Sequence, residues 1–407
     1  MKHWAQNGLK ALTSACVLSM MATVAWSQSL TWLGTLGGDV SAAYGVSNNG
    51  VVVGWAGNAA GQYRAFRWTA SGGMQDLGTL GGDVSAAYGV SADGAVVVGY
   101  AYNAAGDTRA FRWTVDGGMQ DLGTLSGRAS TAYGVSADGA VVVGWDRNAA
   151  GRLRAFRWTA EGGMQDLGTL PGGRESGAYG VSADGAVVVG SSGGRAFRWT
   201  AEGGMQDLGT LPGGCCSYAY GVSADGAVVV GMARNAAGRE RAFRWTAGGG
   251  MQDLGTLGGD SSEALGVSAD GAVVVGRARN AAGELRPFRW TPDGGMEDLN
   301  ITYASLLTNG SWLVWAFVSP DGRYIAGYGY NAATRRYEAF LLDTEPRCTT
   351  HNGDVDANGC VDDADLLAVL FAFGNTGSNL GRVDVNCDEV VDDADLLIVL
   401  FNFGSGC

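Results

Sequence analysis

Two acidic segments near the C-terminus have the residue types and the spacing of calcium-binding loops. One begins at Asp354 and the other at Asp384, and each leads into an apolar run long enough for a short helix. In such loops, side-chain oxygens at positions 1, 3, 5, 9 and 12 and the carbonyl of position 7 surround the ion. The predicted ligands are Asp354, Asp356, Asn358, Cys360, Asp362 and Asp365 in the first loop, and Asp384, Asn386, Asp388, Val390, Asp392 and Asp395 in the second.

The two loops differ at position 6, where the chain must turn sharply. Gly359 occupies this position in the first loop and Glu389 in the second. A positive φ is costly for residues other than Gly and Asn. We therefore predict two Ca²⁺ sites, of which the second binds more weakly. A merely acidic segment, with ten Asp, one Glu and one Arg between Cys348 and Cys407, is the alternative.

The duplicated loop and helix, with no helix ahead of each loop, resembles the type I dockerin domain from Gly353 to Gly404. The resemblance implies a small calcium-stabilised α domain. It also implies attachment to a cohesin-like or cell-surface protein through loop positions 10 and 11 and the following helix. These positions hold Asp-Ala in both loops instead of the family's usual hydroxyl pair. The resemblance therefore supports calcium binding by this chain more directly than cohesin binding.

The N-terminus predicts export of the chain. Residues 1–27 contain two early lysines, an apolar run of about sixteen residues and a small-x-small cleavage pattern, which together indicate a secretory signal peptide. The run is short for a membrane span. We expect a mature bacterial protein without a membrane span, either secreted or on the cell surface. It keeps six cysteines, for which disulfides are expected and the connectivity is open: Cys215, Cys216, Cys348, Cys360, Cys387 and Cys407.

Most of the chain consists of copies of one unit, typified by residues 87–125. The Trp of its AFRWT motif recurs every 41 to 46 residues, at Trp68, Trp113, Trp158, Trp199, Trp245 and Trp290. Each unit holds four short apolar runs separated by turn-forming residues. Such a period, with four strands per unit, is typical of a β-propeller blade.

The ends of the repeat region favour a ring over an open β-solenoid. The first-strand motif occurs seven times, the chain opens with a lone fourth strand at Leu30–Leu36, and the repeats end with a third strand at Ala339–Asp343. Paired, these fragments complete one blade. The predicted fold is all-β: a seven-bladed β-propeller of four-stranded blades over residues 28–345, closed by the N-terminal strand, followed by a small α loop-helix domain over residues 346–407.

The unit resembles the HAF family of extracellular repeats, whose pattern includes DLGTLGG, VS-x-x-G, VVG and His-Ala-Phe-x-Trp segments. The resemblance covers about Leu33 to Asp343 and implies an extracellular setting without implying a reaction. The chain departs from the family at the name-giving His, which is replaced by Arg64, Arg109, Arg154, Arg195, Arg241 and Arg286.

Residues that recur in every unit are interpreted as structural, because an active site needs one constellation and not seven. The aspartates of the Asp-Gly turns supply tight-turn geometry. Two other recurring sets are expected to form ion pairs between blades, with calcium sites as the alternative: Asp76, Asp121, Asp166, Asp207, Asp253 and Asp298, and Arg67, Arg112, Arg157, Arg198, Arg244 and Arg289.

The segments that differ between units are the fourth-to-first connections and the second-to-third loops. In an up-and-down blade both lie at one end of the strands, which we call the variable face. Ligands usually contact such loops, so this face is the predicted surface for a glycan or a protein, with neutral drift as the alternative. Residues that occur once there are Glu175, Cys215, Cys216, Tyr218, Glu240, Glu263 and Glu284; Trp312 and Trp315 are expected to pack, with sugar stacking as the alternative.

Composition narrows the function further. Acidic residues outnumber basic ones by 40 to 27, which disfavours nucleic acid as a partner. Only His351 lies beyond the signal segment, so no histidine triad is possible, and we predict no catalytic residue and no cofactor other than Ca²⁺. The favoured function is a non-catalytic binding protein attached through its tail. The alternative is a glycosidase or lyase of polysaccharide degradation, since a glycosidase needs only two carboxylates.

Overall fold

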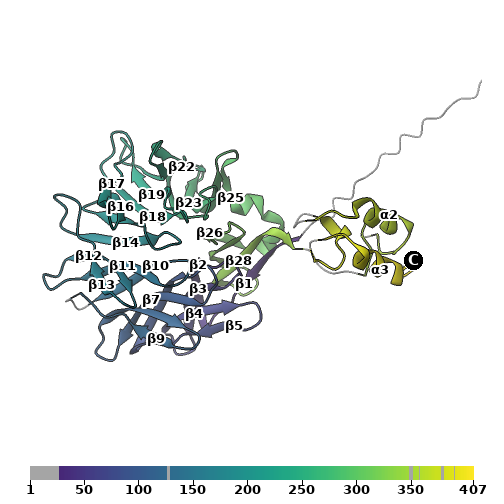
Figure 1. The fold of residues 1–407 in the computed structure, drawn as a ribbon, viewed down its shortest axis with the longest axis horizontal. Helices are drawn as coiled ribbons and strands as arrows, with labels where there is room; N and C mark the ends of the chain where they lie inside the picture. Colours follow the sequence, from purple (N-terminus) through teal and green to yellow (C-terminus); the bar gives the residue numbers. More distant parts are fainter. Residues whose placement is uncertain (1–26, 126–128, 348–351, 357, 377–379, 389) are drawn as a thin grey trace, which may run out of the picture. The chain divides into compact units, whose positions relative to one another are not determined.

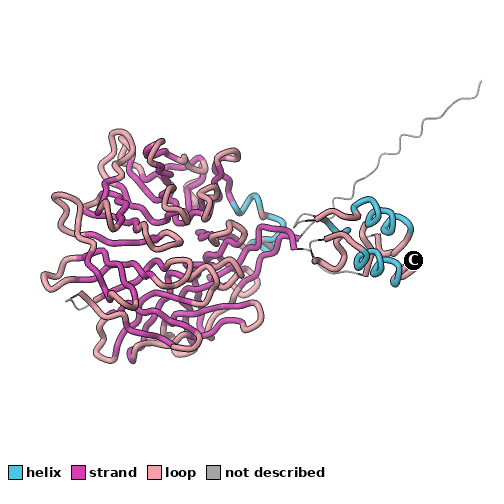
Figure 2. The backbone as a smooth tube through the Cα atoms, in the orientation of Figure 1, coloured by secondary structure: helices cyan, strands magenta, loops and turns pink. Residues whose placement is uncertain are grey.

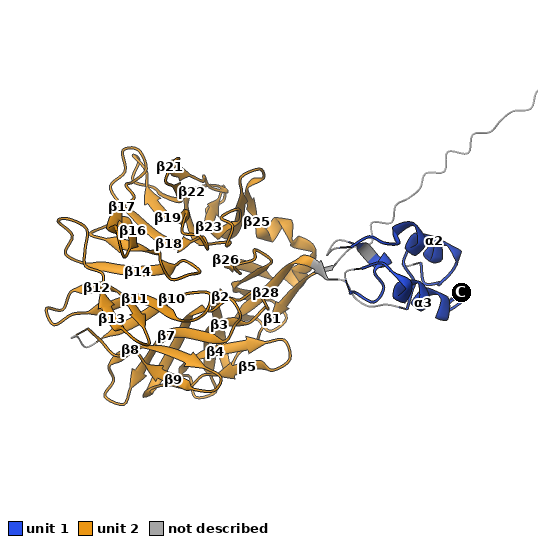
Figure 3. Ribbon diagram, in the orientation of Figure 1, with its two compact units in different colours: residues 1–27, 346–407 blue, residues 28–345 orange. Residues whose placement is uncertain are grey.

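The computed structural model describes residues 27–125, 129–347, 352–356, 358–376, 380–388 and 390–407. The predicted signal peptide, apart from Ser27, lies outside the described residues, as do Cys348, His351 and Glu389. The chain divides into two compact units, one formed by Gln28–Glu345 and one that contains residues 346–407 (Figure 3). Among the described residues, no helix has the length and apolar character needed to cross a membrane.

Four-stranded antiparallel sheets, each in chain order, build the larger unit (Figures 1 and 2). One sheet contains β6 (Gly81–Val90), β7 (Val96–Asn103), β8 (Thr108–Thr114) and β9 (Gly118–Asp121). Four more repeat this order: β10 (Ser130–Val135), β11 (Val141–Arg147), β12 (Leu153–Thr159) and β13 (Gly163–Asp166); β14 (Ser176–Val181), β15 (Val188–Ser192), β16 (Arg195–Thr200) and β17 (Gly204–Asp207); β18 (Ser217–Val222), β19 (Val228–Arg234), β20 (Glu240–Thr246) and β21 (Gly250–Asp253); β22 (Gly258–Val267), β23 (Val274–Asn280), β24 (Leu285–Thr291) and β25 (Gly295–Asp298).

The two ends of this unit share an eight-stranded sheet. Its halves are β2 (Gly37–Val46), β3 (Val52–Asn58), β4 (Tyr63–Thr69) and β5 (Gly73–Asp76), and β26 (Trp312–Val318), β27 (Tyr324–Asn331), β28 (Arg336–Arg347) and β1 (Ser27–Trp32). One parallel bridge, between Val40 and Tyr337, joins the halves. As expected for the terminal fragments, β1 pairs with β28. A short helix, α1 (Leu299–Thr302), follows β25.

In the repeat that contains residues 87–125, the first and fourth strands differ in their boundaries from the predicted apolar runs. The strand β6 begins at Gly81 and not at Ala87, because Gly81 already pairs with Asn103. The fourth strand, β9, ends at Asp121 and not at Leu125. Its Asp121 carboxylate accepts the N–H of Gly123 at 2.8 Å and turns the chain out of the sheet.

The apolar core lies between neighbouring sheets. Phe111 of β8 is fully buried, and its cluster combines Val97 and Ala101 of its own sheet with Val53 and Leu77 of the preceding one. The alternation of apolar and polar residues along each strand sends one face to this core. Burial of one such Phe contributes about 2–3 kcal/mol, and the repeat supplies an equivalent Phe in every sheet.

The turns between first and second strands are built by a Ser and an Asp. Ser91 Oγ donates to Asp93 Oδ1 at 2.6 Å, and the same oxygen accepts the N–H of Ala95 at 3.0 Å. These bonds, that from Ser91 first, lower the pKa of Asp93. The prediction that the recurring turn aspartates serve turn geometry is confirmed.

Backbone hydrogen bonds connect each of these turns to the next sheet's turn. The N–H of Ala92 donates to the next turn at 3.1 Å, and the series runs on to the carbonyl of Pro320. Proline has no N–H to continue it. Instead, the N–H of Asp321 donates to Asn48 Oδ1 at 2.9 Å, and the N–H of Asn48 donates to Ala92 at 3.0 Å. The last turn therefore contacts the first.

The predicted ion pairs between blades are wrong. Arg67 Nε donates to the carbonyl of Gly94 in the next sheet at 3.1 Å, whereas Asp76 faces Arg64 of its own sheet at 4.0 Å. The register explains this result: Asp76 lies opposite Phe66, so its side chain shares a sheet face with residues 64 and 66, and Arg67 points to the other face. Equivalent bonds to carbonyls are made by Arg112, Arg157, Arg198 and Arg244.

One buried carboxylate departs from the repeat, and its removal should stabilise the protein. Asp146 of β11 is fully buried, burial raises its pKa, and no ion pair to it occurs within the described residues. A raised pKa in the folded state means that the charged carboxylate opposes folding at neutral pH, and that this cost disappears below the unfolded pKa.

We expect Asp146→Ala to raise the free energy of unfolding by about 1–3 kcal/mol at pH 7, and by less near about pH 4, where the acid is protonated. Alanine fits because it occupies the same strand position at Ala56, Ala101, Ala233 and Ala278. Urea unfolding at the two pH values measures the effect. An equal gain at both would contradict the electrostatic cause.

Candidate functional site

In the smaller unit, both predicted calcium loops end in a capped helix. Asp365 is the third residue of α2 (Asp363–Ala372), and Asp395 is the third residue of α3 (Asp393–Phe401). The preceding Asp362 and Asp392 are N-caps whose carboxylates accept a backbone N–H two residues on at 2.8 Å. An Asp cap with a second Asp three residues later forms a capping box, so the local sequence sets where each helix starts.

The first loop brings three predicted ligands together. One carboxylate oxygen from each of Asp354, Asp356 and Asp365 lies within 4.8 Å of the others. Asp365 is fully buried and accepts the N–H groups of Val355 at 2.6 Å and Asp362 at 2.9 Å. Three negative charges at this separation repel one another unless a cation lies between them. Their all-oxygen chemistry suits Ca²⁺.

The second loop repeats the arrangement with Asp384, Asp388 and Asp395, again within 4.8 Å. The buried Asp395 accepts the N–H groups of Val385 at 2.5 Å and Asp392 at 2.9 Å. The two loops therefore hold their carboxylates by the same backbone bonds. Glu389, on which the predicted difference in affinity depends, lies outside the described residues.

The remaining predicted ligands border these groups. Asn358 Nδ2 donates to Asp356 Oδ2 at 3.0 Å, and Asn386 Nδ2 donates to Asp388 Oδ2 at 2.9 Å. At position 7, the N–H of Cys360 donates to Asn358 Oδ1 at 2.7 Å. The corresponding N–H of Val390 donates to Asp388 Oδ1 at 3.0 Å. All twelve predicted residues thus lie in the two loops, but three carboxylates in each form the closest group.

The disulfides act on the same loops. Cys360 is bonded to Cys407, which ties the chain end to the first loop, and Cys387 in the second loop is also disulfide-bonded. Cys215 and Cys216 are free thiols, so the disulfides expected for the six cysteines do not include this adjacent pair. Links of this kind stabilise a small unit by restricting its unfolded state.

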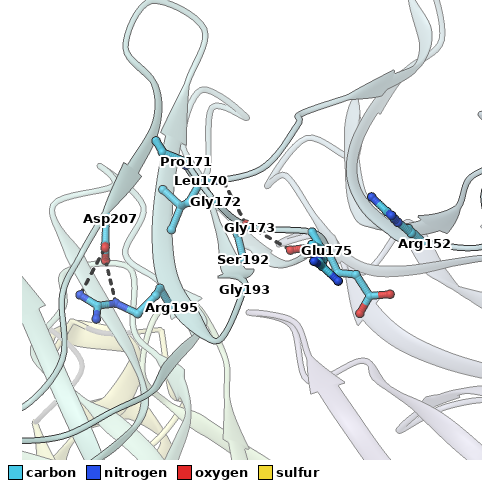
Figure 4. A pocket seen from close by; sticks show the side chains of 11 residues that line it. Arg152, Leu170, Pro171, Gly172, Gly173, Glu175, Ser192, Gly193, Arg195 and Asp207 are labelled. Atoms are coloured by element: carbon cyan, nitrogen blue, oxygen red, sulfur yellow. Dashed lines mark hydrogen bonds and ion pairs between the residues drawn. The ribbon is translucent and has the colours of Figure 1, made fainter.

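On the variable face, a cavity of about 800 Å³ lies between two kinds of loop (Figure 4). Its wall includes Arg174 and Glu175 of the fourth-to-first connection, Arg152 of a second-to-third loop, and Arg195, which pairs with Asp207 at 3.3 Å. The cavity is therefore lined by guanidinium and carboxylate groups. Of the residues singled out from the sequence, Glu175 lies in it.

The cavity exists because one loop is short. Between β15 and β16 the chain turns through Gly193 and Gly194, both at positive φ (57° and 80°), as a two-residue type I′ hairpin requires. Ser192 beside this turn fixes the cavity wall, since its Oγ accepts the N–H of Leu170 at 3.0 Å and donates to the carbonyl of Glu175 at 3.1 Å. The Trp spacing of 41 residues, instead of 45 or 46, is the sequence signal of this gap.

The other singled-out glutamates are neutralised by neighbouring arginines. Glu263 accepts from Arg277 at 2.6 Å. Glu240 pairs with Arg234 at 3.2 Å and Glu284 with Arg286 at 2.5 Å. Exposed ion pairs contribute little to stability. Each of these three carboxylates nevertheless already has an arginine partner.

The two tryptophans of the last unit pack as expected. Trp312 stacks on Tyr330 and Trp315 on Tyr328, each with ring centroids 4.3 Å apart. Trp315 Nε1 also donates to the carbonyl of Ala43 at 3.4 Å. Trp315 thus links the last sheet to the first.

A set of residues that the sequence did not single out converges from all units. One residue of each first strand lines a shared cavity of about 360 Å³. In six units this residue precedes Gly-Val, whereas Phe317 stands directly before Val318. We call this set the central aromatic ring: Tyr44, Tyr88, Tyr133, Tyr179, Tyr220, Leu265 and Phe317. Neighbouring rings touch, with centroids 5.3 Å apart for Tyr44 and Tyr88 and 5.8 Å for Tyr44 and Phe317. The signal was present as the repeated Tyr-Gly-Val, which we had interpreted as structural.

Solved structures similar to this chain are β-propellers. Oligogalacturonate lyase in complex with manganese has a TM-score of 0.54 at 11% identity, over 77% of this chain and 92% of that chain. The oligogalacturonate lyase from Vibrio parahaemolyticus has 0.52 at 9%, over 77% and 93%. The β-propeller domain of the trilobed protease from Pyrococcus furiosus has 0.51 at 10%, over 79% and 97%. No protein-family model and no curated protein matches the sequence. At such identities the similarity indicates the β-propeller fold alone.

Proposed function

We propose that this chain is a secreted, non-catalytic binding protein. Its larger unit is a seven-bladed propeller that presents the variable face to a glycan or a protein. Its smaller unit is a dockerin-like domain, stabilised by two Ca²⁺ ions, that attaches the propeller to another protein. The blade count is supported by two observations: seven first-to-second-strand turns follow one another through backbone bonds, and the last returns to Asn48; β1 adds the fourth strand beside β28.

The observation that carries the binding function is the cavity on the variable face. The first-to-second-strand turns at the opposite end repeat one Ser-Asp hydrogen-bond pattern, from Ser91 with Asp93 to Ser319 with Asp321. The loops at the variable face differ, and the shortest of them opens the cavity beside Arg195 and Glu175. A rigid scaffold that varies only at one end is typical of binding proteins.

Calcium binding is supported by the donor set of the two loops. Each brings three carboxylates within 4.8 Å and fixes the buried one through backbone N–H groups. Residues Asp354, Asp356 and Asp365 would hold the first ion, and Asp384, Asp388 and Asp395 the second. A bound Ca²⁺ would offset the mutual repulsion of the three carboxylates in each loop.

Attachment is supported by apolar side chains that both tail helices leave exposed. Phe371 is 87% exposed and Phe401 is 84% exposed. They belong to two matched stripes, which are Leu367, Leu370, Phe371 and Phe373, and Leu397, Leu400, Phe401 and Phe403. Exposed patches of this kind mark protein interaction sites, so the tail offers a partner protein an apolar surface in duplicate.

The test separates binding from turnover. The full-length protein with calcium is run through gels that contain single polysaccharides and is incubated with the same polysaccharides in solution. We expect retardation by at least one polysaccharide or capture by one purified surface protein, with no new reducing ends and no unsaturated products. Product release that disappears on substitution of one pair of variable-face carboxylates would replace the proposal by the alternative below.

The second candidate is an enzyme of polysaccharide degradation. The similarity of the larger unit to oligogalacturonate lyases favours it, although at 9–11% identity that similarity concerns the fold. Groups of three or more potential metal ligands occur, among the described residues, only in the two tail loops. The product assay above decides between the two functions.

A further inference from the structure

We propose that the central aromatic ring binds one pyranose unit of an uncharged saccharide. The inference rests on the proposed function, since it names a ligand class for the binding protein and adds a contact site among the first strands to the variable face. The ring is a single site made from one residue of each repeat, which the cavity of about 360 Å³ joins. Its size falls in the range of small-ligand pockets.

Two of the tyrosine hydroxyls are bonded to tryptophans outside the cavity wall, so their ring carbons are left to line it. Tyr44 Oη accepts from Trp55 Nε1 at 3.4 Å, and Tyr133 Oη accepts from Trp145 Nε1 at 3.2 Å. Both tryptophans belong to second strands, outside the cavity wall. Aromatic carbon is the surface against which the C–H face of a pyranose packs, because that face is apolar and the aromatic ring is flat.

The ring stays neutral over a wide pH range. Burial, first among the causes, raises the pKa of Tyr88, Tyr133, Tyr179 and Tyr220. All seven side chains of the ring are partly exposed, so a ligand can reach them. The lining therefore offers contact area without a formal charge.

One side of the ring carries the polar groups that sugar hydroxyls require. Tyr220 contacts the Glu263 carboxylate, which accepts from Arg277 Nε at 2.7 Å and Nη2 at 2.6 Å. Arg277 occupies the strand position that Trp55 and Trp145 hold in other sheets. A polar cavity of about 200 Å³ adjoins this pair. Here the repeat replaces an aromatic residue by a charged one, beside the single non-aromatic ring member.

The pairing of Glu263 with Arg277 favours an uncharged ligand. Aromatic rings also attract quaternary ammonium groups, but no carboxylate is among the described residues that line this cavity, and Glu263, which contacts Tyr220, is paired with Arg277. An anionic saccharide gains little from the Arg277 guanidinium, because Glu263 already neutralises it. A neutral pyranose uses both features, packing on the aromatic residues and exchanging hydrogen bonds with the Glu–Arg pair.

The test compares ring and control variants of the full-length protein by calorimetry and tyrosine fluorescence. The probes are a panel of uncharged oligosaccharides, oligogalacturonate and tetramethylammonium chloride. The ring variant is Tyr88→Leu with Tyr133→Leu, two side chains whose rings lie 5.0 Å apart, and leucine is already present in the ring as Leu265. The control is Tyr102→Leu in β7, which lies outside the ring.

We expect an uncharged oligosaccharide to bind the native protein and to lose about tenfold or more in affinity for the ring variant, because two aromatic contacts are removed. Tyr102→Leu should keep the native affinity, since Tyr102 lies outside the ring. If the double variant does not fold, each single Tyr→Leu variant carries the same comparison.

Four results would overturn the inference. Unchanged affinity in the ring variant would place the saccharide elsewhere and leave the proposed function standing. Binding of oligogalacturonate or of a protein, but of no uncharged saccharide, would refute the ring as a sugar site alone. Tetramethylammonium binding that the ring variant loses would make the ring a cation site. Failure to bind any saccharide or protein would refute the proposed function as well.

Discussion

Removing calcium should unfold residues 346–407 while residues 28–345 stay folded. Each loop holds three carboxylates within 4.8 Å, and the core beneath them consists of six fully or largely buried valines. A core of this size provides little stability by itself. A ligand at a hundred times its Kd adds about 2.7 kcal/mol, and its loss also exposes the repulsion between the carboxylates.

The measurement is limited proteolysis and amide exchange of the full chain with calcium and after chelation. The matched variants are Asp365→Asn, which alters the buried loop carboxylate, and Asp363→Asn, which removes one exposed charge from the same helix turn. Only the first should weaken calcium binding and protection. Equal protection of the tail with and without calcium would refute the calcium sites.

The second large effect is expected from Gly54→Ala. Gly54 belongs to the repeated Val-Val-Gly of the second strand, and a Cβ at this position would collide with the backbone carbonyl oxygen of Ala42 in the paired strand. A carbonyl held in a sheet cannot move aside as a flexible side chain can. We expect a loss of about 3 kcal/mol in the free energy of unfolding, the upper part of the usual cost of overpacking.

Gly57→Ala provides the control in the same strand β3. The nearest atom to its Cβ would be the carbonyl oxygen of Val40 at 3.6 Å, an ordinary contact, and the backbone there does not have a positive φ. Urea unfolding should show little change for this variant. Similar losses for both variants would mean that the conformational preference of glycine, and not the close approach of the strands, accounts for the repeat.

The sequence alone determined the parts of the molecule that depend on local spacing. The start of each tail helix follows from an Asp cap with a second Asp three residues later, and the convergence of Asp354, Asp356 and Asp365 follows from their places in one loop. The four strands of each repeat unit follow from apolar runs separated by turn residues. The pairing of β1 with β28 followed from the complementary ends of the repeat region.

Only the tertiary structure decided which side chains meet. Strand register directs Asp76 toward Arg64 and Arg67 toward the next sheet. A shift of one residue would reverse the sheet face on which each side chain lies, and the repeat motif does not reveal that register. Beyond their first turns the tail helices are apolar on all sides, so their sequences could not tell the buried Val369 from the exposed Phe371. The cavity near Gly193 lies where the loop between β15 and β16 is shorter than the equivalent loops of the other repeats.

The central aromatic ring shows the limit most clearly. A residue repeated in every unit was assigned to the architecture because seven copies along a chain occupy seven places. When the units follow one another so that the last contacts the first, the first strands bring one side chain each to a single cavity, and Tyr44 meets both Tyr88 and Phe317. Spacing along the chain fixes what each unit contains, whereas the arrangement of units in space determines that side chains from seven units line one cavity.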